Sequence, residues 1–175
     1  MIDGVTITKL KIISDHRGSV LPMLRSDTKV FESFGEIYFS TIFNGSIKAW
    51  HLHKKAVLNY ACIKGKVKLA LFDDRKKSST FGKYAEYILT PEDYFLITIP
   101  PFIWNGFKGL GESESIIANC INLPHDENEM IRKDHDDNYF NEKQNNDDDM
   151  KRNNNTKWLY DFFNGEKNDT YDDCN

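Results

Sequence analysis

Seven short runs rich in β-branched and aromatic residues are distributed over residues 5–122, and their spacing constrains the fold more than any other feature. Turn-forming segments containing Gly, Pro, Asn and Asp separate the runs at intervals of mostly about ten residues. No long stretch with helical periodicity intervenes. This pattern predicts an antiparallel barrel or a two-sheet jelly roll. The runs are VTITKLKII, EIYFSTIF, AVLNYACI, KVKLALFD, AEYILT, YFLITI and SIIANCIN.

Length and composition indicate one folded domain outside the membrane. The 175 residues are 39% apolar and 13% aromatic, enough for a sizeable core. No apolar run approaches the roughly 18 residues of a membrane helix, and the first residues lack the apolar centre of a signal peptide. Cys62, Cys120 and Cys174 form no CxxC pair, so we expect a reducing compartment and a cytoplasmic protein.

The charge is divided unevenly along the chain. Residues 1–110 carry 16 Lys and Arg against 10 Asp and Glu, whereas residues 111–175 carry 7 against 17. A basic body can attract an anionic ligand. The lysines are scattered through strand-like segments and no nucleic-acid motif occurs, so we expect no nucleic-acid partner.

The composition changes after residue 124. Residues 124–137, PHDENEMIRKDHDD, are expected to form a short helical or irregular segment. Residues 1–140 are predicted to be the domain. Residues 141–155 include nine Asn or Asp and predict a linker or flexible loop. Residues 156–175 are predicted to be a tail, with a short helix over the apolar segment 156–164.

An HxH pair on a predicted strand is the strongest chemical signal. In Lys48-Ala49-Trp50-His51-Leu52-His53, the two histidines are two residues apart and share one face of a strand. Two inward imidazoles are costly in a core unless they act as metal ligands or as a general base. A divalent site needs further ligands, but residues 54–60 contain no carboxylate. We therefore expect no metal.

Three other segments carry candidate binding residues. Arg17, in the turn of Asp15-His16-Arg17-Gly18, can bind a phosphate or carboxylate with its guanidinium fork, or the turn can be an ordinary hairpin. The stretch 73–82 is a strand end followed by a basic loop. In the stretch 99–107, Trp104 offers either a stacking surface or core packing.

Taken in order, these motifs resemble the dTDP-4-dehydrorhamnose 3,5-epimerase family. The family shows D-x-R-G, R-G-L-H, D-x-R-x-x-S-x-T-F-G and P-x-G-F-x-H-G-F. This chain has DHRG, KAWH, DDRKKSSTFG and PPFIWNGF at similar spacings, over residues 8–134. The resemblance implies an all-β cupin-type jelly roll (a double-stranded β-helix) with a polar C-terminal extension. It further implies a homodimer that needs no cofactor and acts on a dTDP-4-keto-6-deoxyhexose.

The resemblance also implies roles for individual residues. His51 matches the family's catalytic base, and Arg17 and Lys48 match basic residues that bind substrate. Asp73 and Arg75 match a motif whose role is structural or at the subunit contact. Asn105 replaces the family's second histidine, so Asn105, Trp104 and Asn119 are counted as further substrate-binding candidates. The carboxylate that orients the base is expected from the C-terminal part, with candidates Asp134, Asp136 and Asp137.

The family's general acid is a tyrosine on the strand 115–121, where this chain has Ala118 or Asn119. His53 is the candidate replacement, with solvent held by Asn105 or Tyr139 as alternatives. The segment KAWHLHK also resembles the R-G-x-H-x-H-K of sugar-nucleotide 3,4-ketoisomerases. A 3,4-ketoisomerase or a single-centre epimerase therefore remains an alternative, and an inactive sugar-nucleotide-binding protein is a third.

Overall fold

The computed structural model describes residues 1–135, which form strands and turns without a helix. Twelve strands follow one another along this part of the chain. They are β1 (Thr6–Lys9), β2 (Ile13–Asp15), β3 (Gly18–Val20), β4 (Glu36–Ile42), β5 (Ile47–His53), β6 (Leu58–Lys64), β7 (Val67–Asp73), β8 (Tyr84–Leu89), β9 (Phe95–Ile99), β10 (Ile103–Gly109), β11 (Ser115–Ile121) and β12 (Met130–Arg132).

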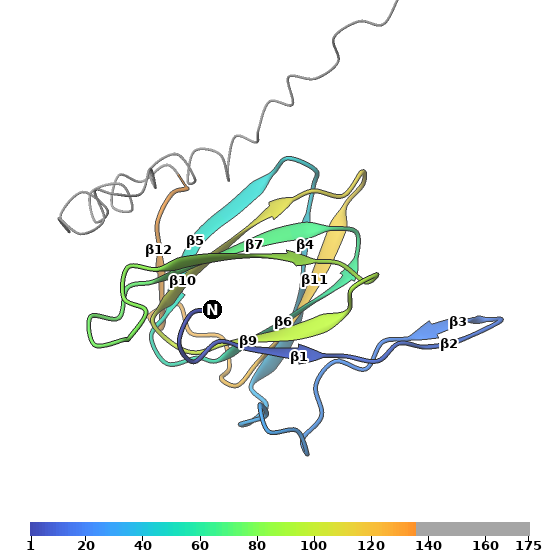
Figure 1. Ribbon diagram of the computed structural model, residues 1–175, viewed down its shortest axis with the longest axis horizontal. Helices are drawn as coiled ribbons and strands as arrows, with labels where there is room; N and C mark the ends of the chain where they lie inside the picture. The colour runs from blue at the N-terminus through green and yellow to red at the C-terminus, as the bar shows by residue number, and fades with distance from the viewer. Residues whose placement is uncertain (136–175) are drawn as a thin grey trace, which may run out of the picture. The chain divides into compact units, whose positions relative to one another are not determined.

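Ten of these strands form two antiparallel five-stranded sheets. The first sheet has the order β1-β9-β6-β11-β4 and the second has the order β12-β5-β10-β7-β8. Successive strands alternate between the sheets for much of the chain, which is the arrangement of a jelly roll (Figure 1). The predicted all-β, cupin-type jelly roll is therefore confirmed.

The core lies between the two sheets and is built by residues at alternate strand positions. Val67, Leu69 and Leu71 of β7 are fully buried in it, together with Ile97 of β9 and Ile117 of β11. Because side chains point to opposite faces at successive positions, one strand can line the interior with every second residue. Burial of each of these side chains stabilises the fold by about 1.5–3 kcal/mol.

Strands β2 and β3 form a separate hairpin that extends away from the two sheets (Figure 1). Ile13 and Val20 are paired across it and both are exposed, so they share one apolar face. Arg17 lies in its turn and is bound to Asp15 through Nη2, at 2.6 Å. A two-stranded hairpin is only marginally stable alone, so this arm is suited to packing against another surface.

The segment 124–137 is irregular, as expected, over most of the residues that the structure describes, with one exception. Residues 130–132 form β12, which pairs with β5 at the edge of the second sheet instead of forming a helical or irregular segment. The polar composition concealed this strand because it is an edge strand of three residues. The predicted linker at 141–155 and the helix at 156–164 lie outside the described residues, as does the predicted domain end at 140.

The motif at residues 73–82, at the end of β7 and in the β7–β8 loop, is organised around a buried carboxylate. Asp73 is fully buried and accepts hydrogen bonds from Arg75, Ser78 and Thr80. Arg75 Nη2 also donates to the carbonyl of Asp3, and the Asp3 amide donates to Thr80 Oγ1. These contacts tie the start of the chain to the β7–β8 loop, so the geometry of Asp73 and Arg75 is that of a structural motif.

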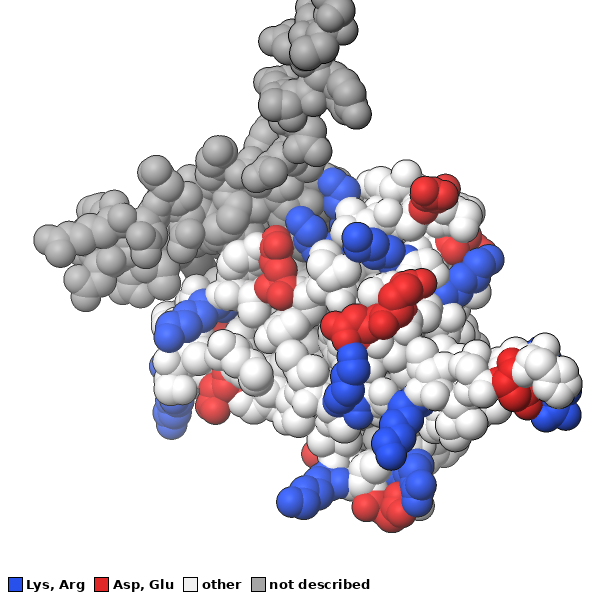
Figure 2. All heavy atoms as spheres, turned by 45° about the vertical axis from the view of Figure 1, so that its right-hand side comes forward, with Lys and Arg blue, Asp and Glu red and all other residues white. Residues whose placement is uncertain are grey.

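The surface charges are mixed on the face that Figure 2 presents. Lys and Arg side chains alternate with Asp and Glu there, without a continuous basic stripe (Figure 2). Nowhere in residues 1–135 is there a helix with the length and apolar character needed to cross a bilayer.

Candidate active site

A cavity of about 370 Å³ opens between the two sheets. Its walls come from β4, β6 and β11 of the first sheet, from β5, β10 and β12 of the second, and from the loop between β11 and β12. The inward faces of the two sheets therefore form the packed core over much of their length and the walls of the cavity over the rest.

His51 and His53 both line this cavity, as their two-residue spacing predicted. Burial lowers the pKa of His51 to about 4, with further contributions from the positive charges of Arg132, His53 and Lys48. His51 is therefore neutral at pH 7 and can accept a proton. Within residues 1–135 no carboxylate is hydrogen bonded to it.

His53 is held by a carboxylate instead. Its Nδ1 lies 2.6 Å from Glu129 Oε2, with only 11% and 10% of the two side chains exposed. The other Glu129 oxygen accepts the amide protons of Lys55 and Ala56 at 2.7 and 2.9 Å. Burial alone would raise the pKa of Glu129, but these amides and His53 lower it below its usual value. The ionised carboxylate fixes the proton on Nδ1 of His53 and leaves Nε2 for the cavity.

Glu129 differs from the carboxylates expected from the sequence. Asp134 was a candidate partner of the base, but the observed carboxylate lies five residues earlier and contacts the second histidine. Asp136 and Asp137 lie outside the described residues.

Two cations line the cavity near His51. Lys48 donates from Nζ to the Thr41 carbonyl at 2.6 Å and lines the cavity as predicted. Arg132 pairs in register with His51 from the neighbouring β12. Glu36, Asp126 and Glu129 also line the cavity, so these two cations make the region near His51 suited to a negatively charged group of a ligand.

Asn105 lies behind His51 and does not line the cavity. This buried amide donates to the His51 carbonyl at 3.0 Å and accepts a hydrogen bond from the Tyr60 hydroxyl at 3.3 Å. Its contacts hold the β5 backbone in place beneath the imidazole, whereas Tyr60 itself faces the cavity.

Asn119 also lies behind the side chains that line the cavity. Its side-chain amide donates to the Tyr38 hydroxyl at 2.8 Å, and its oxygen accepts the Asn59 amide proton at 3.0 Å. Tyr38 is the member of this group that lines the cavity.

Trp104 and Arg17 lie away from the cavity. Trp104 is 2% exposed within β10 and packs in the interior without lining the cavity. The Arg17 side chain is 78% exposed in the hairpin turn. Neither residue meets the histidines within this chain.

The sequence analysis missed most of the other cavity residues, among them Tyr38, Tyr60, Glu129 and Arg132. For Tyr38 a signal was present. In EIYFSTI, the residues at alternate positions Glu36, Tyr38 and Ser40 are polar and line the cavity, whereas Ile37 and Phe39 between them are exposed. An inverted alternation of this kind indicates a strand that faces a polar cavity.

In the described part of the chain, no three His, Cys, Asp or Glu side chains are grouped so that they could hold a metal ion.

Comparison with known families agrees with this site. The sequence profile of dTDP-4-dehydrorhamnose 3,5-epimerases matches residues 1–149. The chain belongs to this epimerase family. It is therefore an enzyme of the epimerase type, and the resemblance inferred from its motifs is confirmed.

Relatives of this epimerase include two curated proteins. A probable low-salt glycan biosynthesis epimerase, Agl13 of Haloferax volcanii, is 31% identical over 67% of this chain and 77% of its own length. The spore coat polysaccharide biosynthesis protein SpsL of Bacillus subtilis is 34% identical over 76% of this chain and 88% of its own. Among solved structures, a dTDP sugar isomerase of Desulfovibrio desulfuricans is 38% identical and superposes with a TM-score of 0.75, covering 77% and 87% of the two chains.

Proposed function

We propose that this enzyme epimerises a dTDP-4-keto-6-deoxyhexose and that His51 removes the proton next to the 4-keto group. The observation that carries the proposal is a neutral, partly buried imidazole in a cavity that also holds Lys48 and Arg132. A neutral imidazole accepts a proton, and the two cations suit a substrate with a negatively charged diphosphate.

The chemistry requires a base and a stabilised enolate. The 4-keto group acidifies the C–H bonds at carbons 3 and 5, and loss of one of these protons leaves negative charge on the oxygen at carbon 4. We propose that His53, fixed by Glu129, donates from Nε2 to this oxygen. Glu129 holds the imidazole through Nδ1, so that Nε2 is the ring atom directed at the substrate.

We propose further that two chains form a homodimer. The hairpin arm exposes an apolar face, and the edge strand β4 exposes Ile37 and Phe39, the latter to 59%, with the exposed Phe43 directly after it. A second copy of the chain would cover these surfaces, and Arg17 of each chain would then reach the cavity of the other and bind the diphosphate. Light scattering should give a dimer mass, and Phe39→Glu should shift it to that of a monomer. A wild-type monomer would contradict this assembly.

The proposed activity is tested by incubating the enzyme with the dTDP-4-keto-6-deoxyhexose in deuterated water. Epimerisation predicts deuterium at carbon 3, or at carbons 3 and 5, together with an inverted product. The variant His51→Ala should keep the fold and lose all exchange. Absence of exchange with the unmodified enzyme would show a binding protein instead. The cysteine pattern also supports a proposed cytoplasmic location.

A 3,4-ketoisomerase is the second candidate, because His51 and His53 face the cavity from one strand and can pass a proton between adjacent carbons on one face of the sugar. Such an enzyme would remove the proton from carbon 3 and deliver a proton to carbon 4 as carbon 3 becomes the carbonyl. The product would carry deuterium at carbon 4, or none if the proton is transferred internally, and its NMR spectrum would show a 3-keto sugar with no inverted centre.

A further inference from the structure

Inversion of a carbon centre needs proton donors and acceptors on both faces of the sugar. A base on one face leaves a planar enolate, and only a proton delivered from the opposite face inverts the centre. His53 lies on the same strand and the same face as His51. It can reach an oxygen or a neighbouring carbon beside His51, but it is poorly placed to protonate the far face.

The opposite wall of the cavity is formed by the other sheet, and it carries Tyr38. His51 projects from β5 of the second sheet, whereas Tyr38 projects from β4 of the first, and both line the same cavity. A sugar ring bound between the sheets would therefore present one face to the imidazole and the other to the phenol. Tyr38 is half-buried, so its hydroxyl is in reach of a ligand.

The register of β4 with β11 links Tyr38 to the position of the absent family tyrosine. Asn119 is directly opposite Tyr38 in the ladder, and it shares the inward face of β11 with Ile117 and Ile121. Its side-chain amide donates to the Tyr38 hydroxyl at 2.8 Å. In this chain β11 therefore supplies a hydrogen-bond donor to a tyrosine, and the adjacent strand supplies the tyrosine itself.

A second donor stands beside the same phenol. Burial raises the pKa of Tyr60 well above its usual value, and a hydrogen bond with Tyr38 adds to this effect. Tyr60 therefore keeps its proton, which it donates to Asn105 in this structure, and rotation of the hydroxyl would direct it to the Tyr38 oxygen instead. A Tyr38 phenolate would receive hydrogen bonds from Asn119 and from the rotated Tyr60 hydroxyl, and these donors would stabilise its negative charge.

We propose that Tyr38 is the general acid that completes the epimerisation, an inference that rests on the proposed function. His51 takes a proton from carbon 3 or 5, and the enolate forms. The Tyr38 O–H bond then breaks as a new C–H bond forms on the opposite face, leaving a phenolate bound by Asn119 and Tyr60. Exchange with solvent returns the lost proton to Tyr38 and removes the extra one from His51.

The test separates proton exchange from inversion, using the dTDP-4-keto-6-deoxyhexose in deuterated water. In Tyr38→Phe, His51 still removes the proton and returns deuterium to the same face. The expected result is deuterium incorporation within about tenfold of wild type and an inverted product reduced by roughly 10²-fold or more. Inversion within about threefold of wild type would overturn the role of Tyr38.

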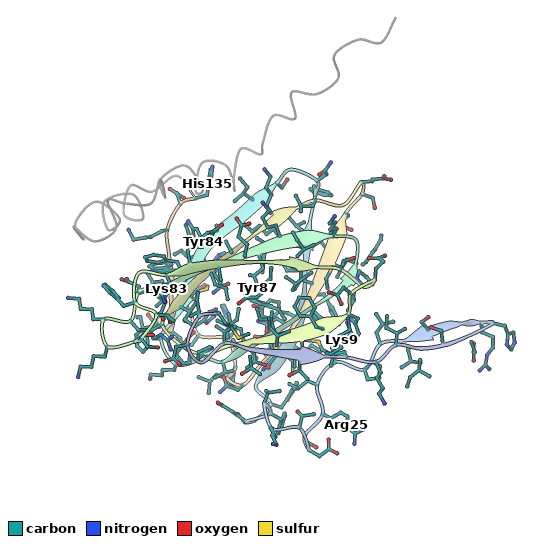
Figure 3. The ribbon with its side chains drawn as sticks, in the orientation of Figure 1. Lys9, Arg25, Lys83, Tyr84, Tyr87 and His135 are labelled. Carbon is teal, nitrogen blue, oxygen red and sulfur yellow. The ribbon has the colours of Figure 1, made fainter. Side chains whose placement is uncertain are left out.

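Control variants keep the experiment decisive. Tyr87→Phe changes a tyrosine on β8, at the sheet edge opposite β12 and outside the cavity, and should leave both rates unchanged (Figure 3). Tyr60→Phe keeps the ring that packs edge-on against Phe107 and removes the second donor together with the hydrogen bond to Asn105, so inversion should fall by about tenfold. If Tyr38→Phe fails to fold, unchanged inversion in Tyr60→Phe overturns the proposal.

Failure of the proposed function gives a different result. A wild-type enzyme that shows no exchange overturns both the function and the role of Tyr38. A wild-type enzyme that exchanges deuterium without inverting any centre also overturns both and supports the ketoisomerase. A wild-type enzyme that inverts a centre, with inversion retained in Tyr38→Phe, overturns the role of Tyr38 alone.

Discussion

Replacing Asp73 with Asn should destabilise the fold through a single buried carboxylate. Oδ2 of Asp73 accepts hydrogen bonds from Ser78 and Thr80, both at 2.6 Å, and from Arg75 Nη2 at 2.8 Å. Oδ1 accepts from Arg75 Nε at 2.8 Å. An amide can keep only one of these oxygens, so its NH₂ group must face donors whichever way it is turned.

The magnitude follows from the charge and from the unsatisfied donors. Burial alone would raise the pKa of Asp73, but the hydrogen bonds of Arg75, Ser78 and Thr80 outweigh it and lower the pKa from 3.8 to about 2. A lowering of this size corresponds to about 2 kcal/mol of stability at neutral pH. Leaving buried donors and Arg75 without their acceptor adds to this, so we expect a total loss of about 3–5 kcal/mol.

Urea unfolding at several pH values measures both effects. Because the pKa is lower in the folded state, the stabilisation by Asp73 is present above pH 3.8 and is lost as the pH falls towards 2. The wild-type free energy of unfolding should fall by about 2 kcal/mol across that interval, and Asp73→Asn should lack this part of the decline.

The chain contains a matched control for this experiment. Asp15 accepts from Arg17 through the same D-x-R geometry, but this pair is exposed on the hairpin. Asp15→Asn should leave the stability unchanged. A loss below about 1 kcal/mol in Asp73→Asn, or an equal loss in both variants, would refute the reasoning.

Three further predictions concern the cavity and one turn. Because the pKa of His51 is lowered to about 4, kcat/KM should decline on the acidic side only as the pH falls towards 4. Arg132→Gln should move this acidic decline to higher pH. A decline of the wild-type kcat/KM near pH 6.5 would contradict the assignment of His51 as the base. Glu129→Gln should lower kcat by about tenfold with little change in KM, since it removes the charge beside the second imidazole, and a selective rise in KM would contradict this role. Gly65→Ala should lower the free energy of unfolding in urea by about 3 kcal/mol, because φ is +76° and a Cβ would lie 2.9 Å from the backbone of β11. Gly45→Ala, at φ +73° in open space, should lower it by only about 1 kcal/mol. Equal losses in the two variants would show that the contact with β11 contributes nothing.

The strand pattern and the paired histidines were predictable because both depend on neighbours in the sequence. A two-residue period places His51 and His53 on one face, whatever the sheet order. The run VTITKLKII was predicted as one strand, but it divides between β1, which belongs to the first sheet, and β2, which belongs to the separate hairpin.

Residues that meet through the sheet order were not predictable in the same way. Tyr38 contacts Asn119 from 81 positions away, and Glu129 contacts His53 from 76. Such contacts depend on which strands become neighbours, which local propensity does not determine. Arg17 illustrates the reverse case, because its motif was recognised but the hairpin carries it away from the cavity of its own chain.

The loop between β11 and β12 has a consequence for how such an enzyme can diversify. It connects one sheet to the other, and Pro124, His125 and Asp126 line the cavity from it. Its two ends are anchored, by Asn122 accepting the Val57 amide proton and by Glu129, but residues 124–128 are exposed and outside any strand ladder. Mutations there can change which sugar fits while the ladders keep the proton-transfer residues in place. Selection can thus alter substrate preference in this segment without first rebuilding the catalytic apparatus.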